Sequence, residues 1–371
     1  MNTSSVRSKL SQGVSRVTTI VGRNLDLPVL SCVLVSTGSD QLILQTTDIE
    51  HAVTVTVPAK IESEGTVAVP ASVFGQLLSG GRGDSVSLVM DDKNLRVKTD
   101  QTNALINILP HEEFPAIPHI ENDEQTKRFD MPVNQLLEGL RSVSFAASQS
   151  NIKPELSSVY VYYEAGVITF VCTDGYRLAE KKYSQDYGGD EFSFLLPVKS
   201  ANALAKVFDT GDSQVTVFVT DNQIALQNDD TYFTCRLVNG SFPDYKRLIP
   251  DEVETSAVVL KSDLVEVLKL SNIFSNEFHE VIVNVDPEKN IFELNSSNQN
   301  VGNNSTKVQA ALEGEALTVT FNHRYLNECL PIISTDSIEV GFNASTGQKK
   351  PIRVTTVPNK QFTYIVMPLD K

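Results

Sequence analysis

The chain has 371 residues, and its 31 Lys and Arg against 46 Asp and Glu give a formal net charge of -15 at pH 7. This length suggests two or three domains, and the 41% hydrophobic and 21% charged fractions argue against disorder, collagen and coiled coil. An acidic chain with a pI near 4.8 is a poor candidate for gripping nucleic acid over its whole surface. Without a run of 18 apolar residues or an apolar core near the N-terminus, we expect no membrane partner and a cytoplasmic location.

Helix-like and strand-like segments alternate along the chain, and the strands have the period of two that half-buried antiparallel strands show. The first third is predicted to contain helices at 4–21 and 71–79 and strands at 42–48 and 66–70. The middle third is predicted to contain helices at 132–148 and 198–208 and strands at 158–163, 168–174, 192–197 and 214–219. The last third is predicted to contain strands at 290–295 and 317–321 and helices at 261–275 and 322–334, with Pro331 ending or kinking the last helix. The fold class is therefore α+β, with two helices against antiparallel sheet in each third.

One set of sequence markers recurs in the same order at nearly constant spacing. A strand ending in Thr-Asp, a strand broken by Pro and a Phe-Pro pair reappear 126, 127 and 128 residues later, at Asp48 and Asp174, Pro70 and Pro197, and Pro115 and Pro243. The last third repeats the scheme more loosely, with Asn298 standing 124 residues after Asp174. Polar, linker-like stretches separate the repeats, which predicts three domains at residues 1–120, 128–250 and 254–371.

No catalytic or metal-binding motif stands out in the sequence. There is no nucleotide-binding glycine loop, no HExxH and no GxSxG, and the five His show no ligand spacing. The four Cys are isolated and are expected to be buried free thiols. The acidic pairs Asp91-Asp92 and Asp229-Asp230 fall in predicted hairpin turns, where solvated carboxylates are more common than a catalytic pair. We therefore expect a non-enzymatic protein with no catalytic residue, metal or cofactor; a hydrolase that uses those carboxylates is the weaker alternative.

Charge is divided unevenly between the predicted helices and the rest of the chain. The windows 3–20 and 198–208 carry +3 and +2, and the other four helix windows are neutral. The six helices therefore carry +5 in total, and the remainder of the chain carries -20. If the helices share one surface, that surface is mildly basic on an acidic body and suits loose binding of a polyanion. An accidental split of charge explains the same numbers.

Five short segments, in order along the whole chain, resemble the signature segments of one family. They are LPVL at 27–30, TDIE at 47–50, TDGYRLA at 173–179, SFPDYKRLIP at 241–250 and YIVMPL at 364–369. Together they resemble the bacterial sliding clamp, the beta subunit of DNA polymerase III. That family also consists of three repeated domains, which agrees with the spacing of the markers.

The resemblance implies three repeated DNA-clamp domains, each with two helices packed on antiparallel sheet, and a homodimer whose two chains form a closed six-domain ring around double-stranded DNA. Such a clamp is a non-catalytic processivity factor that slides along DNA regardless of sequence and tethers the replicative polymerase. The implied partners are the DNA polymerase III alpha subunit, the clamp loader, translesion polymerases and mismatch-repair proteins. The alternative is an acidic, β-rich protein-interaction scaffold that does not encircle DNA.

The resemblance also implies a hydrophobic peptide-binding pocket between the second and third domains. Its positions are Leu156, Thr173, Gly175, Tyr176, Arg177, Leu178, Pro243, Arg247, Leu248, Pro351, Ile365, Val366, Met367, Pro368 and Leu369. The apolar side chains would form a hollow, while Arg177 and Arg247 would orient a backbone or a carboxylate at its rim. Tyr176 stands where many relatives have His or Phe, which changes the expected motif preference.

Two further sets of residues follow from the resemblance. DNA contacts are expected at Arg7, Lys9, Arg16, Arg23, Gln149, Ser150, Lys153, Lys199 and Lys206. At the seam of the dimer, Ile106 of the first domain is expected to meet Ile273 and Phe274 of the third.

Overall fold

The computed structural model describes residues 1–22, 26–120, 126–184, 186–187, 191–208, 214–343 and 350–369. The chain forms two compact units, the first from residues 1–137, 187–190 and 199–237 and the second from residues 138–186, 191–198 and 238–371. These units share the middle third of the chain between them, so the domain boundaries near residues 120 and 250 stay predictions. In the described part of the chain, no helix is long and apolar enough to cross a membrane.

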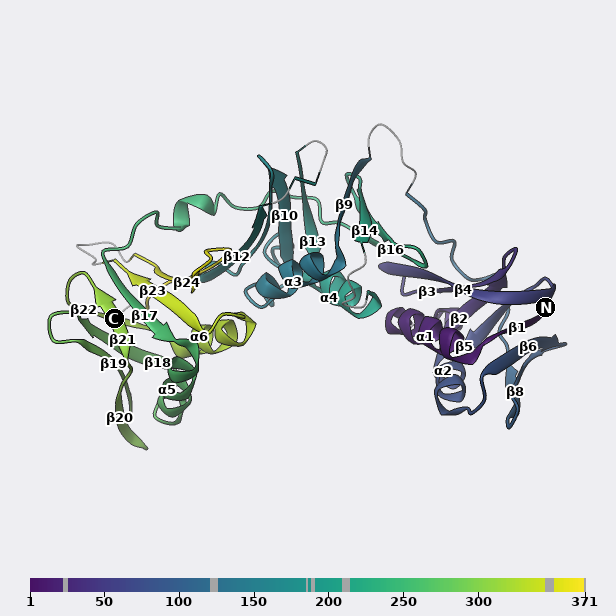
Figure 1. Cartoon of the computed structure of the whole chain (residues 1–371), viewed down its shortest axis with the longest axis horizontal. Helices are drawn as coiled ribbons and strands as arrows, with labels where there is room; N and C mark the ends of the chain where they lie inside the picture. Colours follow the sequence, from purple (N-terminus) through teal and green to yellow (C-terminus); the bar gives the residue numbers. More distant parts are fainter. Residues whose placement is uncertain are drawn as a thin grey trace. The chain divides into compact units, whose positions relative to one another are not determined.

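The first unit is built on one antiparallel sheet of twelve described strands, along the path β8-β7-β6-β1-β4-β16-β15-β14-β9 with β2, β3 and β5 beside it. The strands are β1 (Asn2–Val6), β2 (Cys32–Thr37), β3 (Gln41–Thr47), β4 (His51–Ser63), β5 (Thr66–Pro70), β6 (Ser85–Asp91), β7 (Asn94–Lys98), β8 (Asn103–Asn107), β9 (Lys127–Pro132), β14 (Gln214–Val219), β15 (Gln223–Gln227) and β16 (Thr231–Arg236). Helices α1 (Arg7–Val17) and α2 (Ala71–Gly80) contact each other beside this sheet (Figure 1). Helices α3 (Val133–Ser144) and α4 (Val198–Val207) each contain a boundary between the two units.

The core of the first unit forms where α1 covers β3 and β4. Leu10, Val14 and Val17 of α1 are fully buried, because their spacing places them on one face of the helix. A Cβ at Gly13 would come within 2.7 Å of the side chain of Val57 in β4. Glycine at this position therefore allows the helix to approach the sheet closely.

The second unit contains a nine-stranded sheet and a four-stranded sheet among its described residues. The first has the order β13-β10-β11-β12-β25-β24-β23-β17-β21, and the second has the order β20-β19-β18-β22. The strands are β10 (Ser158–Glu164), β11 (Val167–Thr173), β12 (Arg177–Ser184), β13 (Phe192–Pro197), β17 (Thr255–Leu260), β18 (Glu280–Asp286), β19 (Ile291–Asn298), β20 (Gly302–Lys307), β21 (Ala310–Glu313), β22 (Leu317–Asn322), β23 (Ser337–Phe342), β24 (Ile352–Val357) and β25 (Phe362–Val366). Helix α5 (Lys261–Ile273) contacts both α6 (His323–Cys329) and β19.

The predicted helix at 4–21 was wrong at its start. Residues 2–6 form β1, which pairs with β4 on one side and β6 on the other. The inward-facing residues of β1 are the small polar residues Thr3 and Ser5. The alternation of apolar and polar residues that usually indicates a strand is therefore missing from the sequence. At the other end of the chain, α6 stops at Cys329 and a single 3-10 turn over Leu330–Ile332 follows, as the prediction at Pro331 requires.

Two strand pairings join consecutive repeats of the sequence. Strand β4 pairs antiparallel with β16 in the first unit, and β12 pairs antiparallel with β25 in the second. Each pairing brings a Thr-Asp loop beside a strand from the following repeat.

The cysteines and the acidic pairs have the structural roles that the sequence predicts. Cys32, Cys172, Cys235 and Cys329 are all free and buried, and burial raises the pKa of each thiol. Asp92 follows β6 in a turn and Asp229-Asp230 connects β15 to β16, whereas Asp91 is the last residue of β6 and, like Asp230, forms an ion pair with an arginine. In the described residues, no group of three His, Cys, Asp or Glu side chains could hold a metal ion.

Candidate functional site

The loop between β11 and β12 is fixed by hydrogen bonds that its own sequence dictates. The Thr173 hydroxyl donates to the carbonyl oxygen of Arg177 at 2.6 Å and accepts from the Gly175 amide at 3.1 Å. Asp174 Oδ1 accepts from the amides of Tyr176 and Arg177 at 2.9 and 3.0 Å. Gly175 has φ +93°, a conformation that glycine adopts without steric cost. The Thr-Asp-Gly sequence therefore builds a rigid turn that projects Tyr176 outward.

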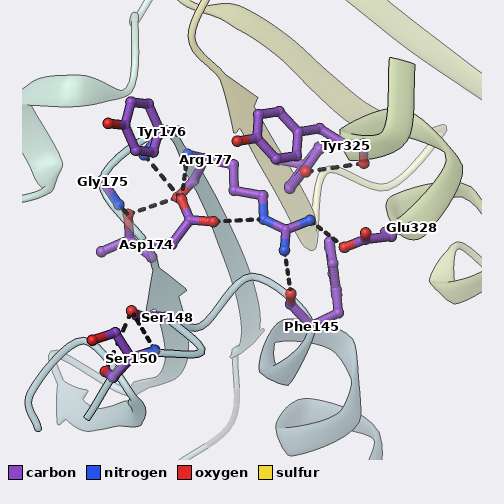
Figure 2. A network of polar contacts seen from close by, with 11 residues as sticks. Phe145, Ser148, Ser150, Asp174, Gly175, Tyr176, Arg177, Tyr325 and Glu328 are labelled. Carbon is purple, nitrogen blue, oxygen red and sulfur yellow. Dashed lines mark hydrogen bonds and ion pairs between the residues drawn. The ribbon is translucent and has the colours of Figure 1, made fainter. Parts of the chain in front are cut away.

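Arg177 is buried beneath this loop, and each of the three nitrogens of its guanidinium donates a hydrogen bond to the protein (Figure 2). It donates to Asp174 Oδ2 at 3.0 Å, to the carbonyl oxygen of Phe145 at 2.9 Å and to Glu328 of α6. It also lies over the ring of Tyr325, 4.9 Å from the centroid. Burial lowers the pKa of Arg177, but the hydrogen bond with Glu328 and the charge interactions with Tyr364, Glu328 and Asp174 together outweigh burial and raise the pKa above its ordinary value.

The expected role of Arg177 at the rim therefore needs correction, because the side chain is 8% exposed and positions the loop from below. Arg247 is different: its side chain is 85% exposed and forms an ion pair with Asp244 at 2.6 Å. Of the two arginines, only Arg247 is exposed enough to meet a carboxylate from solution.

The C-terminal strand runs beside the same loop. The Met367 amide donates to the carbonyl oxygen of Tyr176 at 2.9 Å. Ile352 pairs with Val366, which places Pro351 across from Met367. Met367, Pro368, Leu369 and Pro351 are half-buried. The tail and the loop thus form one continuous surface in the second unit.

A buried apolar cluster supports this surface. Leu178 and Ile365 are 1% and 2% exposed and pack with Tyr162, Val171 and Tyr245, against which Phe242 and Ile249 also lie. The Tyr245 hydroxyl donates to Glu180 Oε2 at 2.8 Å, which satisfies two buried polar groups at once. The segment 242–249 is therefore held beside the loop and the tail through this cluster.

The predicted pocket residues divide into a buried floor and an accessible rim. Thr173, Leu178, Ile365 and Val366 are buried, whereas Tyr176 is 66% exposed and Leu248 is 50% exposed. We call the accessible apolar residues the Tyr176 rim, which consists of Tyr176, Pro243, Leu248 and Met367. Leu156 is half-buried, and its carbonyl oxygen accepts from the amide of Ser148 at 2.8 Å. Sequence reasoning missed Phe145, Tyr325 and Glu328, because no local pattern marks side chains that meet only through Arg177.

The structure distinguishes between the residues predicted to contact DNA. Lys9, Gln149, Ser150, Lys153, Lys199 and Lys206 are exposed. Arg7 instead donates to the carbonyl oxygens of Leu78 and Gly83 at 2.8 and 2.7 Å, and Arg16 pairs with Asp230 at 3.0 Å. Arg23 lies outside the described residues. The first set is accessible to a ligand, whereas both arginines already serve the fold of the first unit.

The predicted seam residues also differ in exposure. Ile273 is 59% exposed, and Phe274, which follows it at the end of α5, is half-buried. Ile106 is only 5% exposed, because the alternation of β8 turns it inward and turns Leu105 outward at 54% exposure. Of these two neighbours on β8, only Leu105 is exposed enough to meet another chain, and the seam itself stays a prediction.

Repeated α+β domains that carry an exposed apolar rim over a buried cluster define a multidomain binding scaffold. Comparison with known families identifies which one. The N-terminal, central and C-terminal domains of the DNA polymerase III beta subunit match residues 1–118, 130–244 and 246–370. The chain belongs to the DNA polymerase III beta subunit family, the sliding clamps, which are processivity factors for DNA polymerase III and not catalytic themselves.

Individual relatives agree with this assignment. The chain is 27% identical to the beta sliding clamp of Synechococcus elongatus over 98% of each chain. Its sequence is 26% identical to that of the Thermotoga maritima beta subunit. The crystal structure of that subunit matches with a TM-score of 0.90 over 100% of this chain and 99% of that one. The chain is 25% identical to the Pseudomonas aeruginosa beta subunit, with a TM-score of 0.92 over the whole of both chains. The Pseudomonas aeruginosa clamp has also been solved bound to griselimycin.

Proposed function

We propose that two copies of this chain close head to tail into a ring around double-stranded DNA in the cytoplasm. The ring tethers the alpha subunit of DNA polymerase III and exchanges it for the clamp loader, translesion polymerases and mismatch-repair proteins. These proteins compete for the Tyr176 rim through short peptide segments. A small, partly exposed apolar surface suits such exchange, because limited buried area gives weak and reversible binding.

The observation that carries the peptide site is the main-chain bond from Met367 to Tyr176. It fixes the half-buried Met367 beside the exposed Tyr176, above a floor that is already packed. Such a surface offers apolar anchoring without requiring the core to rearrange. The griselimycin complex of the Pseudomonas aeruginosa relative supports ligand binding by a clamp of this fold.

The test is the affinity of a synthetic peptide copied from the C-terminal tail of the polymerase alpha subunit. Met367→Ala is expected to weaken binding at least tenfold by calorimetry, because truncating a central apolar contact typically costs more than about 1.4 kcal/mol. Deletion of residues 367–371 is expected to abolish binding. Light scattering should show the same oligomeric state for both variants as for the wild type, since neither variant changes a proposed seam residue.

Met90→Ala is the matched control, because Met90 is 40% exposed and belongs to the first unit, whereas the rim belongs to the second. It should bind the peptide as tightly as the wild type. Equal affinity for the wild type and Met367→Ala would refute the assignment of the rim.

A further inference from the structure

The loop between β3 and β4 repeats the bonds of the loop beneath the Tyr176 rim. The Thr47 hydroxyl donates to the carbonyl oxygen of His51 at 2.7 Å and accepts from the Ile49 amide at 3.0 Å. Asp48 Oδ1 accepts from the amides of Glu50 and His51 at 3.1 and 2.7 Å. Thr47 to His51 thus correspond one by one to the residues from Thr173 to Arg177. The same turn stands in the first unit.

The strand beside each loop is placed in the same register. Arg177 pairs with Val366 and Leu178 with Ile365, whereas His51 pairs with Cys235 and Ala52 with Thr234. Continuing this register by one residue, Arg236 occupies the position that Met367 has in the second unit. The alignment of the two sites therefore rests on strand pairing as well as on sequence spacing.

The buried side chain under each loop reaches the second helix of the following repeat. His51 contacts Asp48 Oδ2 at 2.9 Å, and its other ring nitrogen lies 2.9 Å from the hydroxyl of Ser200 in α4. Arg177 contacts Asp174 and Glu328 of α6 in the same way. His51 therefore takes the positioning role of Arg177 with a smaller side chain.

A hollow of about 290 Å³ opens at this point of the first unit. Ile49 and Glu50 of the loop line it together with Pro115 and Arg236, the counterparts of Pro243 and Met367. Gln223 also lines it and corresponds to Pro351, because Gln223 pairs with Arg236. Burial raises the pKa of Cys235 to about 12, so its thiol remains protonated and contributes an uncharged surface. The positions that correspond to the predicted pocket of the second unit thus line an open hollow in the first unit.

The chemistry of this hollow differs from that of the Tyr176 rim at three positions. Ile49 has φ +79°, a strained conformation for a β-branched residue, where the second unit has Gly175. Its side chain is nevertheless 53% exposed. Glu50 replaces Tyr176, and the exposed Arg236 replaces Met367. The hollow is therefore more polar, with a cation where the rim has its methionine.

We propose that this hollow is a second peptide-binding site, which accepts a short extended segment with a small apolar side chain next to a carboxylate. The peptide class is carried over from the Tyr176 rim, so this inference rests on the proposed function. The apolar side chain would enter between Ile49 and Pro115, and the carboxylate would bind the guanidinium of Arg236. One chain would then bind two different segments of a partner, which raises the effective concentration of the second once the first is bound.

Methyl NMR on the full-length protein can test both sites in one sample. The probes are the acetylated tetrapeptide Ac-Ala-Leu-Ala-Asp with a free carboxylate, and the alpha-subunit tail peptide. The methyl groups of Ile49 and Ala52 report on the hollow, and the methyl group of Met367 reports on the rim. The tetrapeptide is expected to shift the Ile49 and Ala52 signals in a saturable manner, and Arg236→Glu should weaken this binding about tenfold. Arg82→Glu, at an exposed arginine outside the hollow, is the matched control and should leave it unchanged.

The outcomes separate the two proposals. If only Met367 responds, and only to the tail peptide, the second site is refuted while the proposed function stands. If neither peptide shifts any of the three residues, both proposals fail. Equal weakening by Arg236→Glu and Arg82→Glu would also overturn the second site, because it would indicate attraction by general charge.

Discussion

Arg177 illustrates how a single residue fixes a binding surface without belonging to that surface. Its guanidinium joins Asp174 of the loop, the carbonyl oxygen of Phe145 and Glu328 of α6 (Figure 2). Removing the guanidinium leaves the Asp174 carboxylate, whose side chain is 18% exposed, without its ion-pair partner, so that among the described residues only the backbone amides of Tyr176 and Arg177 still donate to it. A buried charge that loses its partner destabilises a fold far more than a lost surface pair does.

Arg177→Met is therefore expected to lower the free energy of unfolding by roughly 3 kcal/mol. Arg247→Met, at an 85% exposed arginine that also pairs with an aspartate, should change it by less than about 1 kcal/mol. Urea denaturation of the two variants measures both effects. Equal losses would show that the Arg177 network contributes no more than a surface ion pair.

The local half of this site was predictable from the sequence, whereas the distant half was not. Thr173, Asp174 and Gly175 form their turn through contacts within five residues, so the pattern alone indicates the structure. Glu328 lies 151 residues from Arg177 in sequence and meets it only after α6 packs. For the same reason, the sequence did not distinguish Arg177, which is buried, from Arg247, which is exposed.

At the scale of elements, Arg7 connects the start of α1 to the end of α2. Its guanidinium donates to the carbonyl oxygen of Leu78 in the last turn of α2 and to that of Gly83 just beyond the helix. The last carbonyl groups of a helix lack partners within it, and a cation there complements the helix dipole. The same charge that suggested DNA binding in the sequence therefore serves helix packing.

Arg7→Ala is accordingly expected to lower the free energy of unfolding by about 1–2 kcal/mol, through the loss of two charge-assisted hydrogen bonds. Lys9→Ala, on the same helix but exposed, should change it by less than about 0.5 kcal/mol. Thermal or urea denaturation gives the comparison. A stable Arg7→Ala variant would contradict the capping role and return Arg7 to the set of DNA contacts.

The periodic spacing of apolar residues predicted the helices and strands well wherever the buried face of an element is apolar. Five of the six predicted helices begin within two residues of their observed starts, at 71, 133, 198, 261 and 323. Strand β1 was missed because its inward residues are Thr3 and Ser5, which hydropathy treats as polar. In β8, the period of two was present, but the sequence alone did not determine which of Leu105 and Ile106 faces outward.

For the whole molecule, the proposed ring depends on the edges of the sheets. Strands β8 and β20 each end a described sheet path, and such an edge offers unpaired main-chain groups to another chain. Leu105 is exposed on β8, while Ile273 is exposed at the end of α5, which also contacts β20. Each edge therefore has an exposed apolar side chain on its own strand or on a helix that contacts it, and two different surfaces of this kind suit a heterologous interface, which forms a ring when its rotation closes.

Ile273→Asp is expected to convert the dimer to a monomer, because it places a charge in an apolar contact at both seams of the ring. Light scattering at micromolar concentration should then report the 40.8 kDa mass of one chain rather than twice that value. Ile152→Asp is the matched control, since Ile152 is 88% exposed and lies in a loop that contains none of the proposed seam residues, and it should remain dimeric. With a clamp loader, the wild type should stay on circular DNA at high salt and leave linear DNA from its ends, whereas Ile273→Asp should be retained on neither. A wild-type protein that is monomeric at micromolar concentration would contradict the ring. Equal loss from circular and linear DNA at high salt would also contradict it, because salt screens phosphate contacts but does not release a closed ring from a DNA circle.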